Sequence, residues 1–195
     1  NRKRVFIVGW RRDLALRPAW PPQPTYFKPS SEEVLVGGRR PFRTAASVFE
    51  KPLDVLDPNK VHINHSPELI RVFESTPLNG GSRHESSRVL PCHDGHNGHR
   101  DVYGRIRLGE PGPTMTTACI NPSKGRFLHP TENHGITARH AARFQGFPDG
   151  FIFEGGLFAA ARQIGNAVPR QMGRRVLRVL KRALMDAQRH DTHVR

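Results

Sequence analysis

Residue types that bind metals or act as nucleophiles gather in the stretch CHDGHNGH. Cys92, His93, His96 and His99 could together ligate zinc. Their spacing is looser than in a zinc finger, no second ligand pair follows at finger distance, and the intervening Asp, Asn and Gly residues favour turns. We therefore predict a polar loop that contacts nucleic acid, and no metal site.

Cys92 also follows Pro91, and a Pro-Cys pair can present a nucleophilic thiolate. Such a thiolate needs a base or a helix N-terminus close by. Here His93 follows, and no apolar strand leads into the turn, so a simple loop cysteine is the better interpretation. The sequence has one other cysteine, Cys119, which argues against a disulfide scaffold and fits a reducing compartment.

The stretch RQIGNAVPRQMGRR, residues 162–175, combines residues that suit an anion site. Gly165 permits a close backbone approach or a positive φ, and Asn166 tolerates turns and can both donate and accept hydrogen bonds. Pro169 suits the first position of a helix. We predict a Gly-Asn turn before the last helix, whose exposed N-terminus attracts a carboxylate or phosphate. An ordinary capped helix is the alternative.

The charge balance points to a polyanionic partner. Lys and Arg number 31 against 17 acidic residues, a net charge of +14 in 195 residues. Nucleic acid is the usual partner of such a surplus; a solvated basic surface, or a piece of a more balanced whole, is the alternative. The length suits one ordinary domain, or a medium domain with a small one, and the 36% apolar content supports a core but not a rich one.

Targeting signals are not visible in the sequence. No apolar run approaches the roughly 20 residues of a membrane span, and the N-terminus lacks the apolar core and cleavage site of a signal peptide. We expect a cytoplasmic protein with no membrane partner. Because the sequence opens on Asn1 without an initiator Met, we also expect a fragment or one part of a larger enzyme.

Three segments predict strands: RVFIVGW (residues 4–10), DVYGRIRL (101–108) and PTMTTAC (113–119). The three cations of NRKR adjoin the first of them. They form either a solvated strand end or guanidinium forks that hold a phosphate or a base edge. Five prolines in residues 17–30 predict a linker or an extended arm.

Helix signals are clearest in three places. Ser66 and Pro67 suit an N-cap followed by the first helical position. TARHAARFQG (137–146) predicts a helix with Thr137 as N-cap and Gly146 in the left-handed position after its end. From Val168, apolar residues recur with a helical period among arginines and lysines. Residues 31–100 show no strong periodicity.

In this order, the motifs resemble those of the C-terminal part of DNA cytosine-5 methyltransferases. NRKRVFIVG resembles the eighth motif and RQIGNAVPRQMG the tenth. DVYGRIRLGEPGPTMTT, NPSKGRFLHP and GITARHAARFQGFPDGFIFEG resemble the ninth-motif region. The resemblance covers residues 1–10 and about 100–180, and residues 15–100 fall where this family keeps its variable target recognition domain.

The resemblance implies an α/β fold, part of a Rossmann-like S-adenosylmethionine-dependent methyltransferase domain plus a small irregular target recognition domain. Residues 1–14 would end the catalytic-domain sheet and residues 15–100 would form the recognition domain. Residues 101–153 would hold the ninth motif. Residues 154–195 would hold the tenth motif and the helices that return to the catalytic domain.

The implied reaction transfers a methyl group from S-adenosylmethionine to C5 of a flipped cytosine in double-stranded DNA, after a cysteine attacks C6. Arg2 and Arg4 match the eighth-motif arginines near that cytosine. Gly165, Asn166 and Ala167 match positions beside the methionine end of the cofactor. The ninth motif, here Arg139, Arg143 and the turn at residues 147–149, helps to organise the recognition domain. The expected DNA-binding residues are Arg105, Lys124, Arg126, Arg139 and Arg143.

Two departures from the family pattern concern local stability. The family usually places glutamate at the fourth residue of the Thr-x-Arg-Glu helix start, where His140 stands here, so the reciprocal capping bond is lost and the cap should be weaker. His134 stands where an arginine is common.

The larger departure is the missing chemistry. The family's Pro-Cys-Gln nucleophile, a nearby glutamate and a Gly-rich cofactor loop all precede the eighth motif, and none occurs in this sequence. Cys92 lies after that motif. We expect this segment to be inactive alone and to need a missing N-terminal part or a partner subunit. We also expect the complete enzyme to belong to a bacterial restriction–modification system. A non-catalytic DNA-binding remnant and the recognition subunit of a split enzyme are the alternatives.

Overall fold

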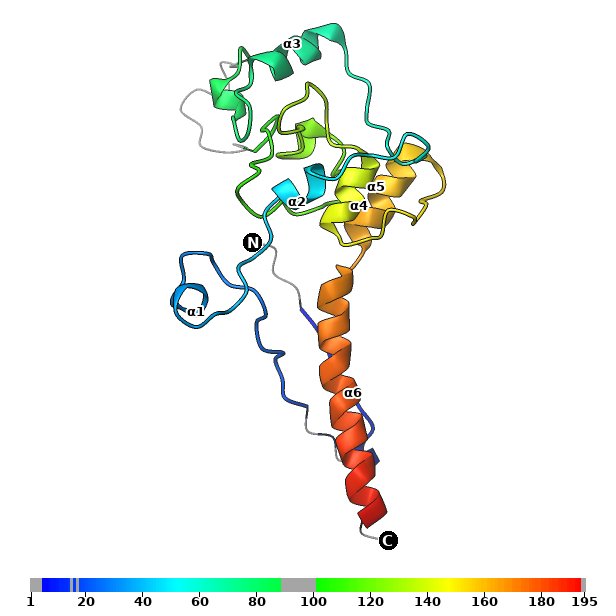
Figure 1. The fold of residues 1–195 in the computed structure, drawn as a ribbon. Helices are drawn as coiled ribbons and strands as arrows, with labels where there is room; N and C mark the ends of the chain where they lie inside the picture. The colour runs from blue at the N-terminus through cyan, green and yellow to red at the C-terminus, as the bar shows by residue number, and fades with distance from the viewer. Residues whose placement is uncertain (1–4, 15, 17, 89–100, 194–195) are drawn as a thin grey trace. The chain divides into compact units, whose positions relative to one another are not determined.

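The computed structural model describes residues 5–14, 16, 18–88 and 101–193, which divide into two compact units. Arg2, Arg4 and the motif with Cys92, His93, His96 and His99 lie outside the described residues. One unit holds the 3-10 helix η1 (Arg12–Leu14), α1 (Glu32–Leu35) and α6 (Arg170–His193) (Figure 1). The other spans residues 43–167 and holds α2 (Ala46–Phe49), α3 (Pro67–Ser75), η2 (Arg83–Glu85), η4 (Pro122–Lys124), α4 (Ala138–Phe144) and α5 (Gly156–Asn166).

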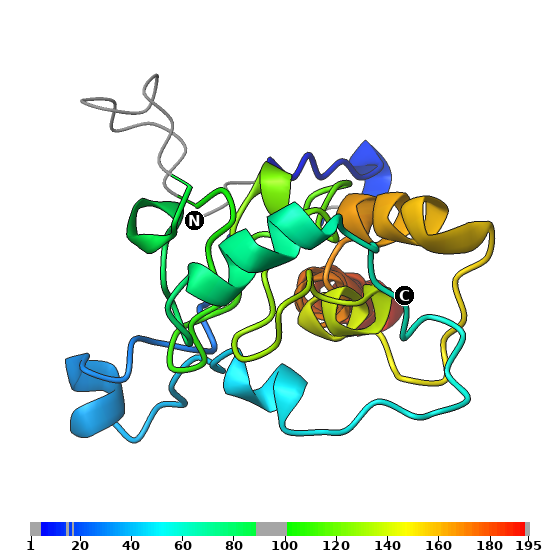
Figure 2. The same ribbon diagram turned by 90° about the horizontal axis from the view of Figure 1, so that it is seen from above.

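Loops, rather than a sheet, join the helices of residues 43–167, as the turned view in Figure 2 shows. Within the described part of the chain, β-type pairing is limited to isolated bridges such as Arg105 with Leu128 and Leu128 with Gly135. The structure therefore does not show the α/β, Rossmann-like arrangement that the sequence predicted. None of the described helices combines the length and apolarity that a membrane crossing requires.

The three predicted strands are wrong for identifiable reasons. Residues 5–10 have strand-like composition but no sheet neighbour among the described residues, and Val5 and Ile7 are 89% and 95% exposed. In residues 101–108, Tyr103 adopts a left-handed conformation with φ 55°, which interrupts an extended strand. In residues 113–119, the amide of Cys119 donates to the carbonyl of Thr116 and closes a turn.

The predicted helix signals are confirmed where side chains cap the helices. The Ser66 hydroxyl accepts a hydrogen bond from the Leu69 amide at 3.4 Å, and Pro67 is the first residue of α3. The Thr137 hydroxyl accepts from the His140 amide at 3.1 Å at the start of α4. Gly146 follows the end of α4 with φ 78°, as expected for a glycine that terminates a helix.

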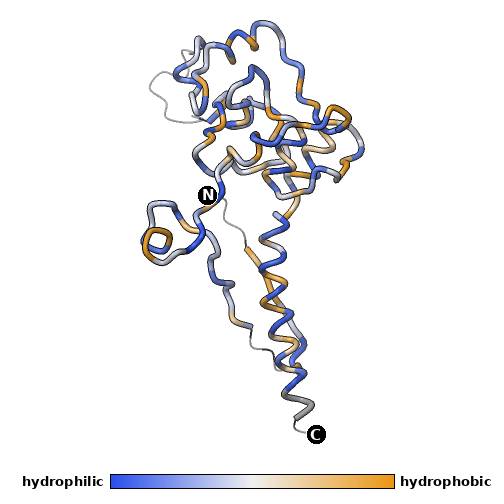
Figure 3. The backbone as a smooth tube through the Cα atoms, in the orientation of Figure 1, coloured by the Kyte–Doolittle hydropathy of each residue, from blue (hydrophilic) through white to orange (hydrophobic). Residues whose placement is uncertain are grey.

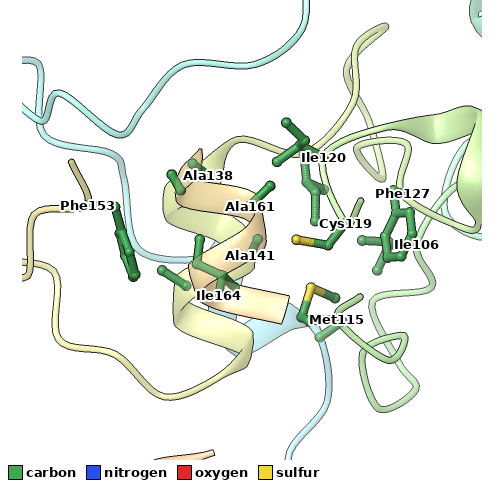
Figure 4. Packing of buried hydrophobic residues seen from close by; sticks show 14 residues of the cluster. Ile106, Met115, Cys119, Ile120, Phe127, Ala138, Ala141, Phe153, Ala161 and Ile164 are labelled. Carbon is green, nitrogen blue, oxygen red and sulfur yellow. The ribbon is translucent and has the colours of Figure 1, made fainter. Parts of the chain in front are cut away.

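The core of residues 43–167 forms where α4 and α5 pack closely. Ala138, Ala141 and Ala142 of α4 are fully buried, as are Ala160 and Ala161 of α5. Small side chains let the two backbones approach, and Figure 4 shows Ala138, Ala141 and Ala161 between the helices. Larger apolar side chains extend the core beyond the helix pair, among them Ile106, Met115, Ile120 and Phe127.

Gly165 lies inside the last turn of α5 and is buried. A Cβ atom there would lie 2.2 Å from the carbonyl carbon of Thr116, so only glycine permits this contact between helix and loop. The predicted Gly-Asn turn is therefore wrong, because Gly165 and Asn166 are helical and the chain leaves the helix at Ala167. Of the two roles considered for Gly165, close backbone approach is the one observed.

The predicted C-terminal helix is confirmed as α6, which begins one residue after Pro169. The carbonyl of Pro169 accepts the first helical hydrogen bond, from the Gly173 amide at 3.0 Å. Blue and orange positions alternate along α6 in Figure 3, as the helical period of apolar residues predicts. Ala183 is buried on this apolar stripe, whereas Leu177 is 65% exposed outside it.

Gly165→Ala should lower the free energy of unfolding of residues 43–167 by about 2 kcal/mol or more, because the added methyl group meets backbone that cannot swing aside. Gly150→Ala is the matched control, since a Cβ at Gly150 has no neighbour within 4 Å. Urea denaturation of the two variants measures the difference. Equal stability of the two variants would contradict the packing described for α5.

Candidate functional site

The tenth-motif segment presents Asn166 and Ala167 at the end of α5. Asn166 is exposed, and its side chain has no hydrogen-bond partner within the part of the chain that the structure describes. Ala167 is half-buried and takes an extended conformation with φ −66° and ψ 146°, which turns the chain out of the helix. An amide side chain displayed in this way can donate to a carboxylate or accept from an ammonium group.

Gln145, which the sequence analysis did not single out, holds this segment in place. The side chain is 7% exposed, and its Nε2 donates to the carbonyls of Ile164 at 2.7 Å and Ala167 at 3.3 Å. Two carbonyls at the C-terminal end of α5, where intrahelical donors run out, therefore gain a partner from the residue that follows α4. The sequence alone does not indicate this contact, because a glutamine beside the glycine that ends a helix has no pattern that predicts a partner 19 or 22 residues away.

The five predicted DNA-binding cations do not form one surface. Lys124 is exposed at the end of η4. The side chain of Arg126 is only 13% exposed, that of Arg143 9% and that of Arg139 1%, and Arg105 is completely buried. The guanidinium groups of Arg105 and Arg139 are already surrounded by protein acceptors, so neither is placed to reach DNA in this conformation, and DNA contact by the five cations stays a prediction.

Arg105 joins the end of α3 to the loop of residues 129–133 through its guanidinium group. Nε donates to the Thr76 carbonyl at 2.9 Å, one terminal nitrogen donates to the carbonyls of His129 and Glu132, and the other donates to the Phe73 carbonyl and to Oδ1 of Asn133. Burial lowers the pKa of Arg105, yet an arginine remains charged at neutral pH. One side chain therefore provides hydrogen-bond donors both to the carbonyl groups at the end of α3 and to the acceptors in the loop of residues 129–133.

Arg139 forms a buried ion pair with Asp57. Its Nε lies 2.5 Å from Oδ2 of Asp57, and its terminal nitrogens donate to the carbonyls of Pro148 and Phe151. Burial by itself raises the pKa of Asp57, but hydrogen bonds from Arg139 and from the Asn59 amide, with the charge of Arg139, outweigh burial and lower it. The pair fixes residues 57–59 against the turn at residues 147–151.

Arg143 and Arg126 act in the same way at two other loops. Arg143 pairs with Asp149 at 2.9 Å and donates to the carbonyls of Val48, Lys51 and Pro52. Its hydrogen bonds hold the pKa of Asp149 well below the usual range. Arg126 pairs with the exposed carboxylate of Asp101. It also donates to the backbone carbonyls of Gly80, Gly81 and Arg105. Direct DNA contact by either arginine would compete with these bonds.

Histidines gather next to this network. The rings of His62 and His134 stack with centroids 4.0 Å apart, and His134 lies 2.5 Å from a carboxylate oxygen of Glu132. His140, which interrupts the expected capping box, packs its ring 4.7 Å from Phe49 and 5.3 Å from His129. The two departures from the family pattern, His134 and His140, thus belong to one aromatic cluster.

Burial keeps two of these histidines neutral. It lowers the pKa of His129 to about 4, an effect that the Glu132 carboxylate opposes. It also lowers the pKa of His140 to about 3, and the nearby His129 and Arg143 charges add to this effect. Within the described residues, no group of His, Cys, Asp and Glu side chains has the arrangement of a metal site. Cys119 is fully buried, which raises its pKa to about 12, so its thiol is not an activated nucleophile.

Comparison with known families decides the classification. The profile of the family described as C-5 cytosine-specific DNA methylase matches residues 1–182. The chain belongs to this methylase family. Members of this family use S-adenosylmethionine as methyl donor, so the tenth-motif segment is the part of the chain to compare with that cofactor.

Individual relatives agree with the assignment. The chain is 37% identical over 122 residues to the type II methylase M.HgiDII of Herpetosiphon aurantiacus, which covers 60% of this chain and 34% of that protein. It is 32% identical over 171 residues to the type II methyltransferase M.NgoFVII of Neisseria gonorrhoeae, covering 87% of this chain and 42% of that protein. It is also 34% identical over 116 residues to mouse DNA (cytosine-5)-methyltransferase 1, covering 55% and 7%. The chain therefore spans well under half the length of these relatives.

Arg105→Lys should lower the free energy of unfolding by about 3–5 kcal/mol, because an ammonium group cannot satisfy the carbonyls that the buried guanidinium serves. Arg107→Lys, at an exposed neighbour that forms a surface ion pair with Glu110, should cost about 0.5 kcal/mol or less. Thermal and urea denaturation give these values. A stable Arg105→Lys protein that has lost DNA affinity would restore the direct DNA contact.

In the unfolded chain, His129 and His140 take up a proton as the pH falls through about 6.5. In the folded protein their pKa values are lowered to about 4 and about 3, so both rings stay neutral to a lower pH. Stability is therefore fully present above about pH 6.5 and is lost as the pH falls, by about 1 kcal/mol per histidine between pH 7.5 and 5.5. His140→Phe should flatten this dependence, and the exposed control His84→Phe should not. Identical pH profiles for the two variants would contradict a buried neutral His140.

Proposed function

We propose that this chain is the recognition and cofactor-wall portion of a DNA cytosine-5 methyltransferase. The complete enzyme transfers a methyl group from S-adenosylmethionine to C5 of a cytosine flipped out of double-stranded DNA. The single observation that carries the proposal is the family match over residues 1–182, a range that includes the three segments resembling the eighth, ninth and tenth motifs. The nucleophile, the catalytic glutamate and the Gly-rich loop belong to enzyme segments beyond this sequence.

Asn166 and Ala167 form one wall of the cofactor site in this proposal. The exposed carboxamide of Asn166 bonds the methionine end of S-adenosylmethionine, which carries both a carboxylate and an ammonium group. The buried contacts of Gly165 and Gln145 support this wall, since they fix the backbone at the end of α5. Arg2 and Arg4 lie near the target cytosine.

The unit of residues 43–167 presents DNA-contacting loops in the same proposal, and the arginines at its centre organise those loops. Lys124 is the one exposed residue among the five first considered for DNA contact, and in this proposal it contacts a phosphate. The other four residues lie largely beneath the surface and contact DNA only through the loops that they hold; they are Arg105, Arg126, Arg139 and Arg143. Their bonds to loop carbonyls determine the shape that meets the DNA.

In the complete enzyme, Asn166→Ala should raise the apparent Km for S-adenosylmethionine about tenfold, because one hydrogen bond to a charged group is lost. The Km for DNA should change less than twofold. Arg162→Ala, at an exposed residue of the same helix, is the control and should leave both values unchanged. A larger change in the Km for DNA than for S-adenosylmethionine would refute the cofactor assignment.

A further inference from the structure

A basic groove lies on the unit that contains α1 and α6, and none of the described residues assigned above belongs to this unit. It has a volume of about 940 Å³ and is lined by Arg39 and Arg40 on one wall and by Arg174, Arg175 and Arg178 of α6 on the other. Tyr26, which is 41% exposed, also lines it. Neither wall contributes a carboxylate to the lining.

The helical wall follows directly from sequence spacing. Gln171, Arg174, Arg175 and Arg178 are separated by three, one and three positions, which places all four side chains on one face of an α-helix. This face differs from the apolar stripe that includes Ala183. The helix therefore carries three guanidinium groups into the groove over little more than one turn.

The opposite wall is fixed by backbone hydrogen bonds. The Phe27 amide donates to the Arg40 carbonyl at 3.0 Å, and the Phe42 amide donates to the Phe27 carbonyl at 2.9 Å. The Arg39 amide donates to the Glu33 carbonyl at 2.8 Å, which ties Arg39 to α1. These bonds close residues 27–42 into a loop and hold the bases of both arginine side chains.

The five arginines face one another without acidic partners. All five are exposed, and none forms an ion pair with any residue that the structure describes. Like charges gathered in one groove repel, so the arrangement is stabilised when an anion enters it. Guanidinium groups bind phosphate oxygens through two parallel hydrogen bonds, which suits them to a phosphodiester chain better than to a single small anion.

We propose that this groove binds the phosphate backbone of duplex DNA without reading its sequence. The number of cations on two walls, and a groove that is open rather than enclosed, fit a polymer that runs through it. Contacts to phosphates position a protein on DNA but carry no base information. The groove thus adds a second, sequence-independent DNA contact, distinct from the loops of residues 43–167 to which the proposed function assigns DNA contact. The choice of DNA as the polyanion rests on the proposed function.

The test is the binding of the full chain to a short labelled duplex of arbitrary sequence, followed by fluorescence anisotropy at several salt concentrations. Arg174→Gln/Arg178→Gln should weaken binding about tenfold near 100 mM salt and reduce the slope of log affinity against log salt by about 2. Arg39→Gln/Arg40→Gln, on the other wall, should do the same. Circular dichroism confirms that the variants remain folded.

Lys181→Gln/Arg182→Gln is the matched control, because it removes the same charge from exposed positions of α6 that do not line the groove. It should weaken binding less than twofold. A loss equal to that of the groove variants would overturn the proposal in favour of diffuse charge. Groove variants that bind the duplex normally but lose binding to phosphatidylglycerol vesicles would also overturn it.

The binding assay does not involve methyl transfer, so it tests the groove proposal independently of the proposed methyltransferase activity. A complete enzyme that methylates DNA, with groove variants of unchanged duplex affinity, would refute the groove alone. A chain that shows the predicted loss with groove variants, while the complete enzyme transfers no methyl group, would refute the proposed activity and retain the groove as an anion site.

Discussion

The unit of residues 43–167 depends on guanidinium groups that satisfy the carbonyls of its loops. A buried carbonyl without a donor is costly, and in most domains helices and sheets provide the donors. Here sheet pairing is reduced to isolated bridges among the described residues. Arg105, Arg126, Arg139 and Arg143 take over part of that task. In each of them Nε donates to a carbonyl or carboxylate while terminal nitrogens reach carbonyls of separate loops.

This constraint links the fold to the proposed function. Asn59 continues the Arg139 network, since its Oδ1 accepts from the Phe153 amide and its Nδ2 donates to the Phe153 carbonyl. Phe153 belongs to the same hydrophobic core as the buried residues of α4 and α5. From that core, Gln145 fixes the backbone that leads to Asn166. The loops of the proposed recognition unit and the proposed cofactor wall are therefore held by one continuous set of contacts.

Sequence reasoning predicted what local chemistry determines. Thr137 and Ser66 cap helices because a hydroxyl beside the first amides needs only the neighbouring residues. The strand expected over residues 4–10 depends on neighbouring strands, which no local pattern guarantees, and the chain covers only 34% of a relative such as M.HgiDII. The order of motifs identified the family, although the α/β fold that the resemblance implied does not form among the described residues.

The candidate site shows the same division. The exposure of Asn166 and the need for glycine at Gly165 were foreseeable, although the helical conformation of both was not. The role of Arg105 was not foreseeable, because an arginine in a basic sequence reads as surface charge until the carbonyls around it are known. The resemblance had already implied that Arg139 and Arg143 organise the recognition domain, and their contacts agree with that role.

Hydrogen exchange of the arginine Nε protons, followed by nuclear magnetic resonance at neutral pH, tests this account most directly. The account predicts four slowly exchanging Nε protons, assigned to Arg105, Arg126, Arg139 and Arg143, against rapid exchange at exposed arginines such as Arg162. Rapid exchange at all arginines, in a chain whose α4 and α5 amides remain protected, would contradict the central role of the buried guanidinium groups.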